Sequence, residues 1–432
     1  MTAMAYVCLL LGAGMAQAQR LDQLLPEGVP GFGTDPGVTV TSRIAPEYQA
    51  PGLRSGLWVF HPGLDLATGY ASNLFATAAP RGSAVLRLSP SIRAGYDDGA
   101  DRLGAALSAS DTRYPMAPAQ GRTDATGALG ASMALGGDRV SFGFADLALH
   151  EDRTALDALS ADTPIAYRVQ TLHLAYAARF AAFSLTPSLD FRRWRYDATT
   201  VQGVYQAQSY RNRDALEAGA VLRYGYSDLR SLVLAARATG LRYTDPVAGL
   251  PSENASGYQI LGGFERADDG VWRVRLLAGW EERIFASSAY PDHGGPMIEA
   301  GLAWLPDEAT TIGLTATRRI EDAAQEGVGG YTLSALALHL DHEAWRNLLL
   351  HAEFAVQRAA YLPGGTAGTG GGQQRQMVAG GGAQWHLNRW MTVYGDASVT
   401  ASRGTAVPGA GSAGGGDAWV DLVSLMGVRF GL

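Results

Sequence analysis

Histidine, serine and the carboxylic acids are the residues that could catalyse a reaction in this chain. Their spacing in the sequence matches no known catalytic or metal-binding motif. The sequence contains neither Gly-x-Ser-x-Gly nor His-Glu-x-x-His, the motifs that place a nucleophilic serine or a zinc ion. His339 and His342 are three residues apart, so in a strand they would lie on opposite faces and could not share a metal. We therefore expect no enzyme, no metal and no cofactor; a Ser/His or Asp/His pair at the rim of a barrel is a minor alternative.

The basic residues exclude two further kinds of chemistry. All 34 of them are arginine, so the chain has no P-loop lysine for nucleotides and no lysine amine for covalent catalysis. Residues 409–414 have the glycine spacing of a dinucleotide site, but they open no helix, and we interpret them as a flexible loop. The net charge of -7 argues against a nucleic acid as partner, because neutralising phosphates requires a basic surface.

The composition favours β structure in a secreted protein. Glycine accounts for 55 of the 432 residues, which is costly in helix interiors, and no apolar run of 18 residues follows residue 19. Residues 1–18 are predicted to be a signal peptide, because an apolar stretch at 5–15 precedes Ala16-Gln17-Ala18, a small-x-small cleavage pattern. Cleavage would remove Cys8, the only cysteine, and leave a mature chain without disulfides.

Residues 19–56 differ from the rest of the chain. Five prolines interrupt them, at positions 26, 30, 36, 46 and 51, and no alternation of apolar and polar residues is sustained. We interpret this stretch as an irregular periplasmic N-terminal segment, and a short plug folded into the barrel is the alternative.

From residue 57 to residue 432 the chain is a series of two-faced strands. Residues 183–196, 310–321 and 391–401 alternate apolar with polar side chains, which is the period of a β-strand with two different faces. Such strands exceed the five or six residues that are usual in soluble sheets and match the 9 to 11 that cross a bilayer at a tilt. Residues 140–151 and 331–342 are mixed rather than cleanly alternating.

The connections between these strands alternate between short and long. Eight short polar links and nine long ones join 18 strands, although 16 remain an alternative. Short periplasmic turns and long extracellular loops are typical of outer-membrane barrels. Because lipid cannot hydrogen-bond to a free sheet edge, the sheet must close. The fold class predicted is therefore an all-β, transmembrane, antiparallel up-and-down β-barrel, with tryptophans such as Trp272 and Trp390 at the membrane interfaces.

Several short motifs resemble one family of barrels. They are Trp58-Val59-Phe60-His61-Pro62-Gly63-Leu64 at the first strand, Trp304-Leu305-Pro306, Asp341-His342-Glu343 with Arg346-Asn347-Leu348, and Leu387-Asn388-Arg389. Together they resemble the putative beta-barrel porin 2 family of Gram-negative bacteria over residues 56–432. The resemblance implies a location in the bacterial outer membrane and, for many members, an association with surface-polysaccharide production.

Charged residues on the polar faces are predicted to line the lumen. The candidate lumen-lining residues are Arg192, Arg211, Arg213, Glu217, Arg223, Arg273, Arg275, Glu281, Arg283, Arg319, Glu353, Asp396, Asp421 and Arg429. Interleaved charges of both signs favour a structural lattice of ion pairs, and the functional alternative is a polar wall that guides a hydrated or acidic glycan.

These patterns predict a passive conduit, with export of a surface polysaccharide as the first hypothesis. A general diffusion porin and a scaffolding barrel that docks a periplasmic partner are the alternatives. The partners we expect are outer-membrane lipid and lipopolysaccharide, and for the first hypothesis a periplasmic polysaccharide-export protein. The sequence does not indicate an oligomeric state.

Overall fold

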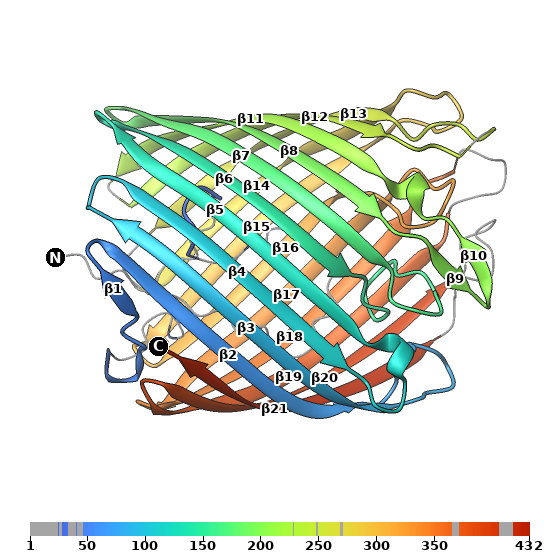
Figure 1. The fold of residues 1–432 in the computed structure, drawn as a ribbon. Coiled ribbons are helices and arrows are strands. Elements are labelled where there is room, and N and C mark those ends of the chain that lie inside the picture. The colour runs from blue at the N-terminus through green and yellow to red at the C-terminus, as the bar shows by residue number, and fades with distance from the viewer. Residues whose placement is uncertain are drawn as a thin grey trace.

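The computed structural model of the chain is a closed antiparallel β-barrel, and it confirms the predicted fold class and strand number (Figure 1). It describes residues 25, 28–32, 40, 46–227, 229–247, 249–267, 271–364, 371–405 and 418–432. The predicted signal peptide lies outside these residues, as does the glycine-rich stretch at 409–414. No helix in the described part of the chain is long and apolar enough to cross a bilayer.

Eighteen strands form the wall, and each pairs with the next along the chain. They are β2 (Trp58–Ala71), β3 (Ser83–Asp97), β4 (Arg102–Arg113), β5 (Arg122–Leu135), β6 (Asp138–His150), β7 (Ala166–Phe180), β8 (Phe183–Tyr196), β11 (Arg213–Ser227), β12 (Arg230–Tyr243), β13 (Ala255–Ala267), β14 (Trp272–Phe285), β15 (His293–Asp307), β16 (Thr310–Glu321), β17 (Tyr331–Trp345), β18 (Leu348–Tyr361), β19 (Gln373–Asn388), β20 (Met391–Thr405) and β21 (Trp419–Gly431). The last strand, β21, pairs with β2 from Gly431↔Gly63 to Val423↔Ala71, which closes the barrel.

The smaller elements lie at the two ends of the barrel. They are β1 (Leu53–Ser55), which forms a hairpin with β2, the hairpin of β9 (Thr199–Val201) and β10 (Val204–Gln206), and the 3₁₀ turns η2 (Pro46–Tyr48), η3 (Pro118–Gln120) and η4 (Ser209–Arg211). The short and long connections fall where the sequence predicts them. The first strand, β1, and the C-terminal end of β21 lie at the end of the barrel that carries the short turns (Figure 1). That end is periplasmic in an outer-membrane barrel.

The two faces of each strand meet different surroundings. On β8, Phe183, Leu185 and Leu189 point outward and are exposed, whereas Ser184 and Asp190 point into the lumen. So many exposed large apolar side chains on the outer wall would make a soluble protein aggregate, and in a membrane they contact lipid. Aromatic pairs lie at the short-turn ends of neighbouring strands, for example Trp272 stacked on Trp304 with ring centroids 5.2 Å apart. They form the periplasmic aromatic girdle.

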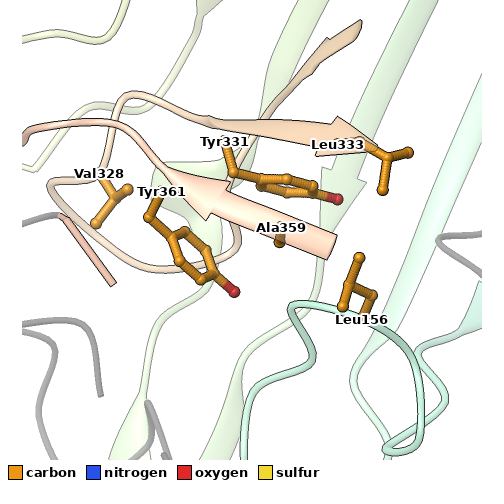
Figure 2. Close-up of a cluster of buried hydrophobic side chains, with 6 residues drawn as sticks. All are labelled: Leu156, Val328, Tyr331, Leu333, Ala359 and Tyr361. Atoms are coloured by element: carbon orange, nitrogen blue, oxygen red, sulfur yellow. The ribbon is translucent and has the colours of Figure 1, made fainter. Parts of the chain in front are cut away.

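The two strands with mixed patterns are explained by what covers them. The inward residues Ala145 and Leu147 of β6 are buried against Val29 of the N-terminal segment. The inward residues Tyr331 and Leu333 of β17 are buried with residues of two long loops (Figure 2). On these two strands, the inward positions are apolar where another part of the chain covers them.

The assignment of faces predicts the effect of charged substitutions on β16. Leu314 lies near the middle of the strand and points to lipid, whereas Thr315 is exposed in the lumen. Leu314→Arg should lower the free energy of unfolding by about 2–4 kcal/mol. Thr315→Arg is the matched control and should change it little. Urea titration of barrels refolded into bilayers measures both, and equal effects at the two positions would contradict the assigned faces.

Candidate functional site

A cavity lies in the half of the lumen next to the long loops. It has a volume of about 500 Å³ and is lined by residues of β7, β8 and β11–β17 and of the three loops that follow β6, β8 and β16. Seven of the predicted lumen residues meet there. They are Arg192, Arg211, Arg213, Glu217, Glu281, Arg283 and Arg319. Arg211 reaches the cavity from η4 in the loop after β8, not from a strand face.

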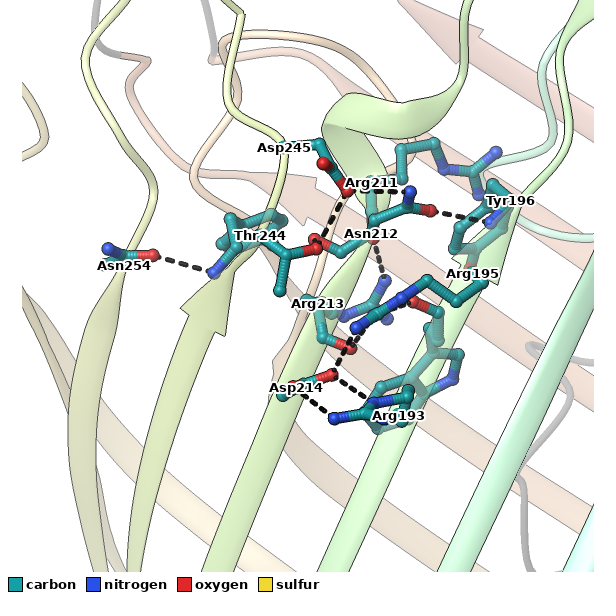
Figure 3. Close-up of polar contacts among 12 residues, drawn as sticks. Arg193, Arg195, Tyr196, Arg211, Asn212, Arg213, Asp214, Thr244, Asp245 and Asn254 are labelled. Carbon is teal, nitrogen blue, oxygen red and sulfur yellow. Dashed lines mark hydrogen bonds and ion pairs between the residues drawn. The ribbon is translucent and has the colours of Figure 1, made fainter.

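The arginines of this cavity are held by carboxylates and aromatic rings. Arg213 of β11 and Arg283 of β14 both bind Asp322, each at 2.8 Å, so the loop after β16 is tied to two distant strands. Arg211 donates to Glu151 at 3.1 Å and lies 4.0 Å above the ring of Tyr196 (Figure 3). Burying such charges is tolerable only because each is paired. The contacts fit a structural lattice of ion pairs better than a row of free guanidinium groups.

The other seven predicted residues lie elsewhere. Arg223 and Arg275 share Glu265, and Arg273 lies on the inward face of β14. Nearer the strand closure, Arg429 binds Asp65 at 3.1 Å. The remaining three residues are carboxylates.

The three carboxylates have separate roles. Asp396 of β20 accepts from His351 of β18 at 3.1 Å, and Glu353 lies two residues along the same strand. Asp421 does not face open lumen, because it accepts bonds from the Asn73 amide at 2.6 Å and the Ser72 hydroxyl at 3.1 Å. It anchors the loop between β2 and β3. The described residues contain no cluster of histidine and acidic side chains that could hold a metal.

A trough in the inner wall receives part of the N-terminal segment. Gly104, Gly130 and Gly143 face one another in register on β4, β5 and β6, and the next row is Ala106, Ala128 and Ala145. A Cβ at Gly130 would lie 1.7 Å from the Pro30 carbonyl oxygen, and one at Gly104 would lie 2.5 Å from the Pro30 ring. Only residues without a side chain allow the segment to lie this close to the sheet.

Other contacts place the described part of this segment along the lumen. Val29 is buried against inward residues of β4–β7, the Val40 amide donates to Thr311 of β16 at 3.1 Å, and the ring of Tyr48 lies 6.3 Å from that of His386. These contacts fit the alternative of a plug folded into the barrel. The boundaries at residues 18 and 56 remain predictions.

Two long loops meet across the other mouth of the barrel. Asp157, in the loop after β6, accepts bonds from the Ala324 amide at 2.6 Å and the Tyr361 hydroxyl at 2.7 Å. Leu156 of the same loop packs with Val328 and Tyr331 (Figure 2). The loops at 151–165 and 322–330 therefore cover β17 and β18 from the inside.

Burial of Asp157 raises its pKa to about 7, an effect that the Tyr361 hydroxyl, the Ala324 amide and the nearby Arg211 partly oppose. Glu253, in the loop after β12, is also buried, and its pKa is raised to about 7. Both carboxyls are thus neutral in mildly acidic solution and ionise as the pH rises through 7.

Sequence reasoning missed several of these residues. Arg237, Glu265 and Glu299 also face the lumen in ion pairs, and alternation along β12, β13 and β15 could have identified them. Asp322 and Asp157 lie on loops, where no periodic signal exists. Alternation along each strand identifies Gly104, Gly130 and Gly143 as inward residues. The sequence of a single strand does not specify that the three lie in register across neighbouring strands.

The trough predicts a way to displace the plug. Gly104→Ala with Gly130→Ala should expel residues 29–32, because the added methyl groups would overlap Pro30. We expect a larger single-channel conductance in planar bilayers. Gly301→Ala is the control, since a Cβ at that inward glycine of β15 would meet nothing within 4 Å. An assembled double variant with parental conductance would contradict the plug.

The loop contacts predict a dependence on pH. Because the pKa of buried Asp157 is raised above that of an exposed aspartate, the contact is fully stable below about pH 4 and weakens as the pH rises through about 7. Conductance should therefore be higher at pH 8 than at pH 5.5. Asp157→Asn keeps the neutral form and should reduce this difference, and Glu253→Gln tests the second carboxyl. If the conductance difference between the two pH values persists when both substitutions are combined, other titratable groups cause it.

Comparison with known proteins gives a family. No curated protein matches the chain. Among solved structures, OccK1 from Pseudomonas aeruginosa aligns with a TM-score of 0.44 at 12% identity, covering 86% of this chain and 98% of that one. The copper transporter OprC aligns with a TM-score of 0.44 at 12% identity, covering 88% and 81%. The family described as putative beta-barrel porin 2 matches residues 45–412, and the chain belongs to this family of outer-membrane β-barrels.

Proposed function

We propose that this outer-membrane channel is a conduit for the export of a surface polysaccharide, and that the structure is its closed form. The observation that carries the proposal is a strip of uncharged polar side chains on the inner wall. Several inward residues of β19 and β20 carry amides or hydroxyls, among them Gln376, Gln384, Ser398, Thr400 and Ser402, and these five are buried. Amide and hydroxyl groups are suited to bind the hydroxyls of a sugar chain.

Unpaired polar atoms along this strip support the same proposal. The Gln376 carbonyl oxygen, the Gln384 amide nitrogen and the His386 Nε2 are buried without a hydrogen-bond partner in the described part of the chain. A buried polar group without a partner costs about 1–3 kcal/mol. Displacement of the segments that fill the lumen would expose these atoms, and a passing polyhydroxylated chain could then bind them.

The ion-pair lattice restricts what the conduit could carry. Because the lumen arginines already bind carboxylates, they offer few free cations for a strongly acidic polymer. A weakly charged or neutral glycan fits this wall better than a polyanion.

A scaffolding barrel is the second candidate, because residues 29–32 lie against the inner wall and the two loops meet at the extracellular mouth. In that case the plug would dock a periplasmic partner and no polymer would pass. A general porin is less compatible with this closure, since it would conduct steadily after purification.

A deletion strain tests the proposal directly. We expect less polysaccharide on the cell surface and more in the periplasm, measured by separate extraction of the two compartments. Unchanged amounts in both would overturn export and leave the scaffold or the porin.

Complementation with variants of β19 then tests the polar strip. Gln384→Leu should lower surface polysaccharide about fivefold, in line with the loss of about 1 kcal/mol of hydrogen bonding. Gln170→Leu is the control, because that glutamine of β7 points outward by strand alternation and lies away from the strip. Equal export by both variants would show that the polar strip does not contribute to transport.

A further inference from the structure

Four arginines form a patch on the outer wall of the barrel. We call Arg168 of β7, Arg193 and Arg195 of β8, and Arg242 of β12 the rim patch. By strand alternation they point away from the lumen, and the first three side chains are 60%, 42% and 36% exposed. Figure 3 shows Arg193 and Arg195 converging on Asp214.

The rim patch contains more positive than negative charge. Its two carboxylates are Asp146, which binds Arg168, and Asp214, which Arg193 and Arg195 bind at 3.0 and 2.9 Å. Asp245, on the loop beyond the patch, accepts from Asn212 and Thr244 instead.

Two features leave part of this positive charge without internal compensation. Arg242 lies directly opposite Asp214 in register, yet its exposed side chain makes no polar contact within the described residues. Arg168 and Arg195 are direct cross-strand partners, an arrangement of like charges that destabilises a sheet unless an anion lies between them.

The position of the patch identifies the anion. β7 begins, and β8 and β12 end, at the long loops, so the patch is on the extracellular side. Below it on the same outward faces lie exposed leucines that contact lipid, including Leu174, Leu189 and Leu234. The arginines are therefore at the level of the outer-leaflet headgroups, where the phosphates belong to lipopolysaccharide. Guanidinium groups bind phosphate through two parallel hydrogen bonds.

We propose that the rim patch is a binding site for the phosphorylated glucosamine disaccharide of lipid A. Arg242 and Arg195 bind its phosphates, while Arg193 and Arg168 stay on Asp214 and Asp146 and orient the site. The acyl chains lie against the leucines below. This site is on the outside of the wall and does not depend on what passes through the lumen.

Purified, detergent-solubilised full-length barrel tests the site by native mass spectrometry titration with lipid A. Arg195→Gln with Arg242→Gln should weaken lipid A binding roughly 10-fold or more, since each arginine near a phosphate contributes about a fivefold effect. Both changes leave Asp214 paired with Arg193, so the barrel should still assemble. The control is Arg113→Gln, an outward arginine at the long-loop end of β4 that pairs with Asp111.

Three ligands are compared with lipid A to distinguish the possible sources of phosphate. The parent protein should prefer lipid A to its dephosphorylated form and to phosphatidylglycerol, and inorganic phosphate should not compete at millimolar concentration. Equal affinity of the parent and the double variant would overturn the proposal, as would an equal loss in Arg113→Gln. A parent that binds phosphatidylglycerol as tightly as lipid A would reduce the patch to general attraction for anionic lipid and also overturn it.

Discussion

In the hydrocarbon layer of a membrane no water is present to hydrogen-bond the peptide groups, and the rest of this structure depends on that constraint. Every spanning strand must pair on both sides, which is why β21 returns to β2 and no edge is left. Closure in turn gives each strand one face toward lipid and one toward an interior. The alternation of apolar and polar side chains along β8 and β16 results from these two surroundings.

The interior created by closure has to be filled or solvated, and this chain does both. Where side chains of both signs face inward, they bind one another, as Arg213 and Arg283 do through Asp322. Such pairs contribute little net stability, because desolvation offsets much of the Coulomb attraction, but removing one partner would leave a buried charge. The lattice therefore fixes the positions of the strands and of the loop after β16 more than it strengthens the barrel.

Elsewhere the interior is filled by the chain itself. The glycine row on β4–β6 allows backbone-to-backbone approach by residues 29–32, and Asp157 joins the loops at the other end. The two closures differ physically. One depends on the shape of the wall, whereas the other depends on a carboxyl group whose pKa lies near neutrality.

The sequence alone determined the strands, their faces, the positions of the turns and the family, because each of these is expressed within about 15 consecutive residues. A period of two and the turn residues that interrupt it are local properties, and lipid imposes them on every strand alike. Only the tertiary structure decided which carboxylate binds which arginine, that Arg211 reaches the lumen from a loop, and that Gly104, Gly130 and Gly143 form one row. These depend on register between strands and on loops that fold back over distant strands. Contacts of this kind join residues far apart in the chain, and no periodicity within a single segment encodes them.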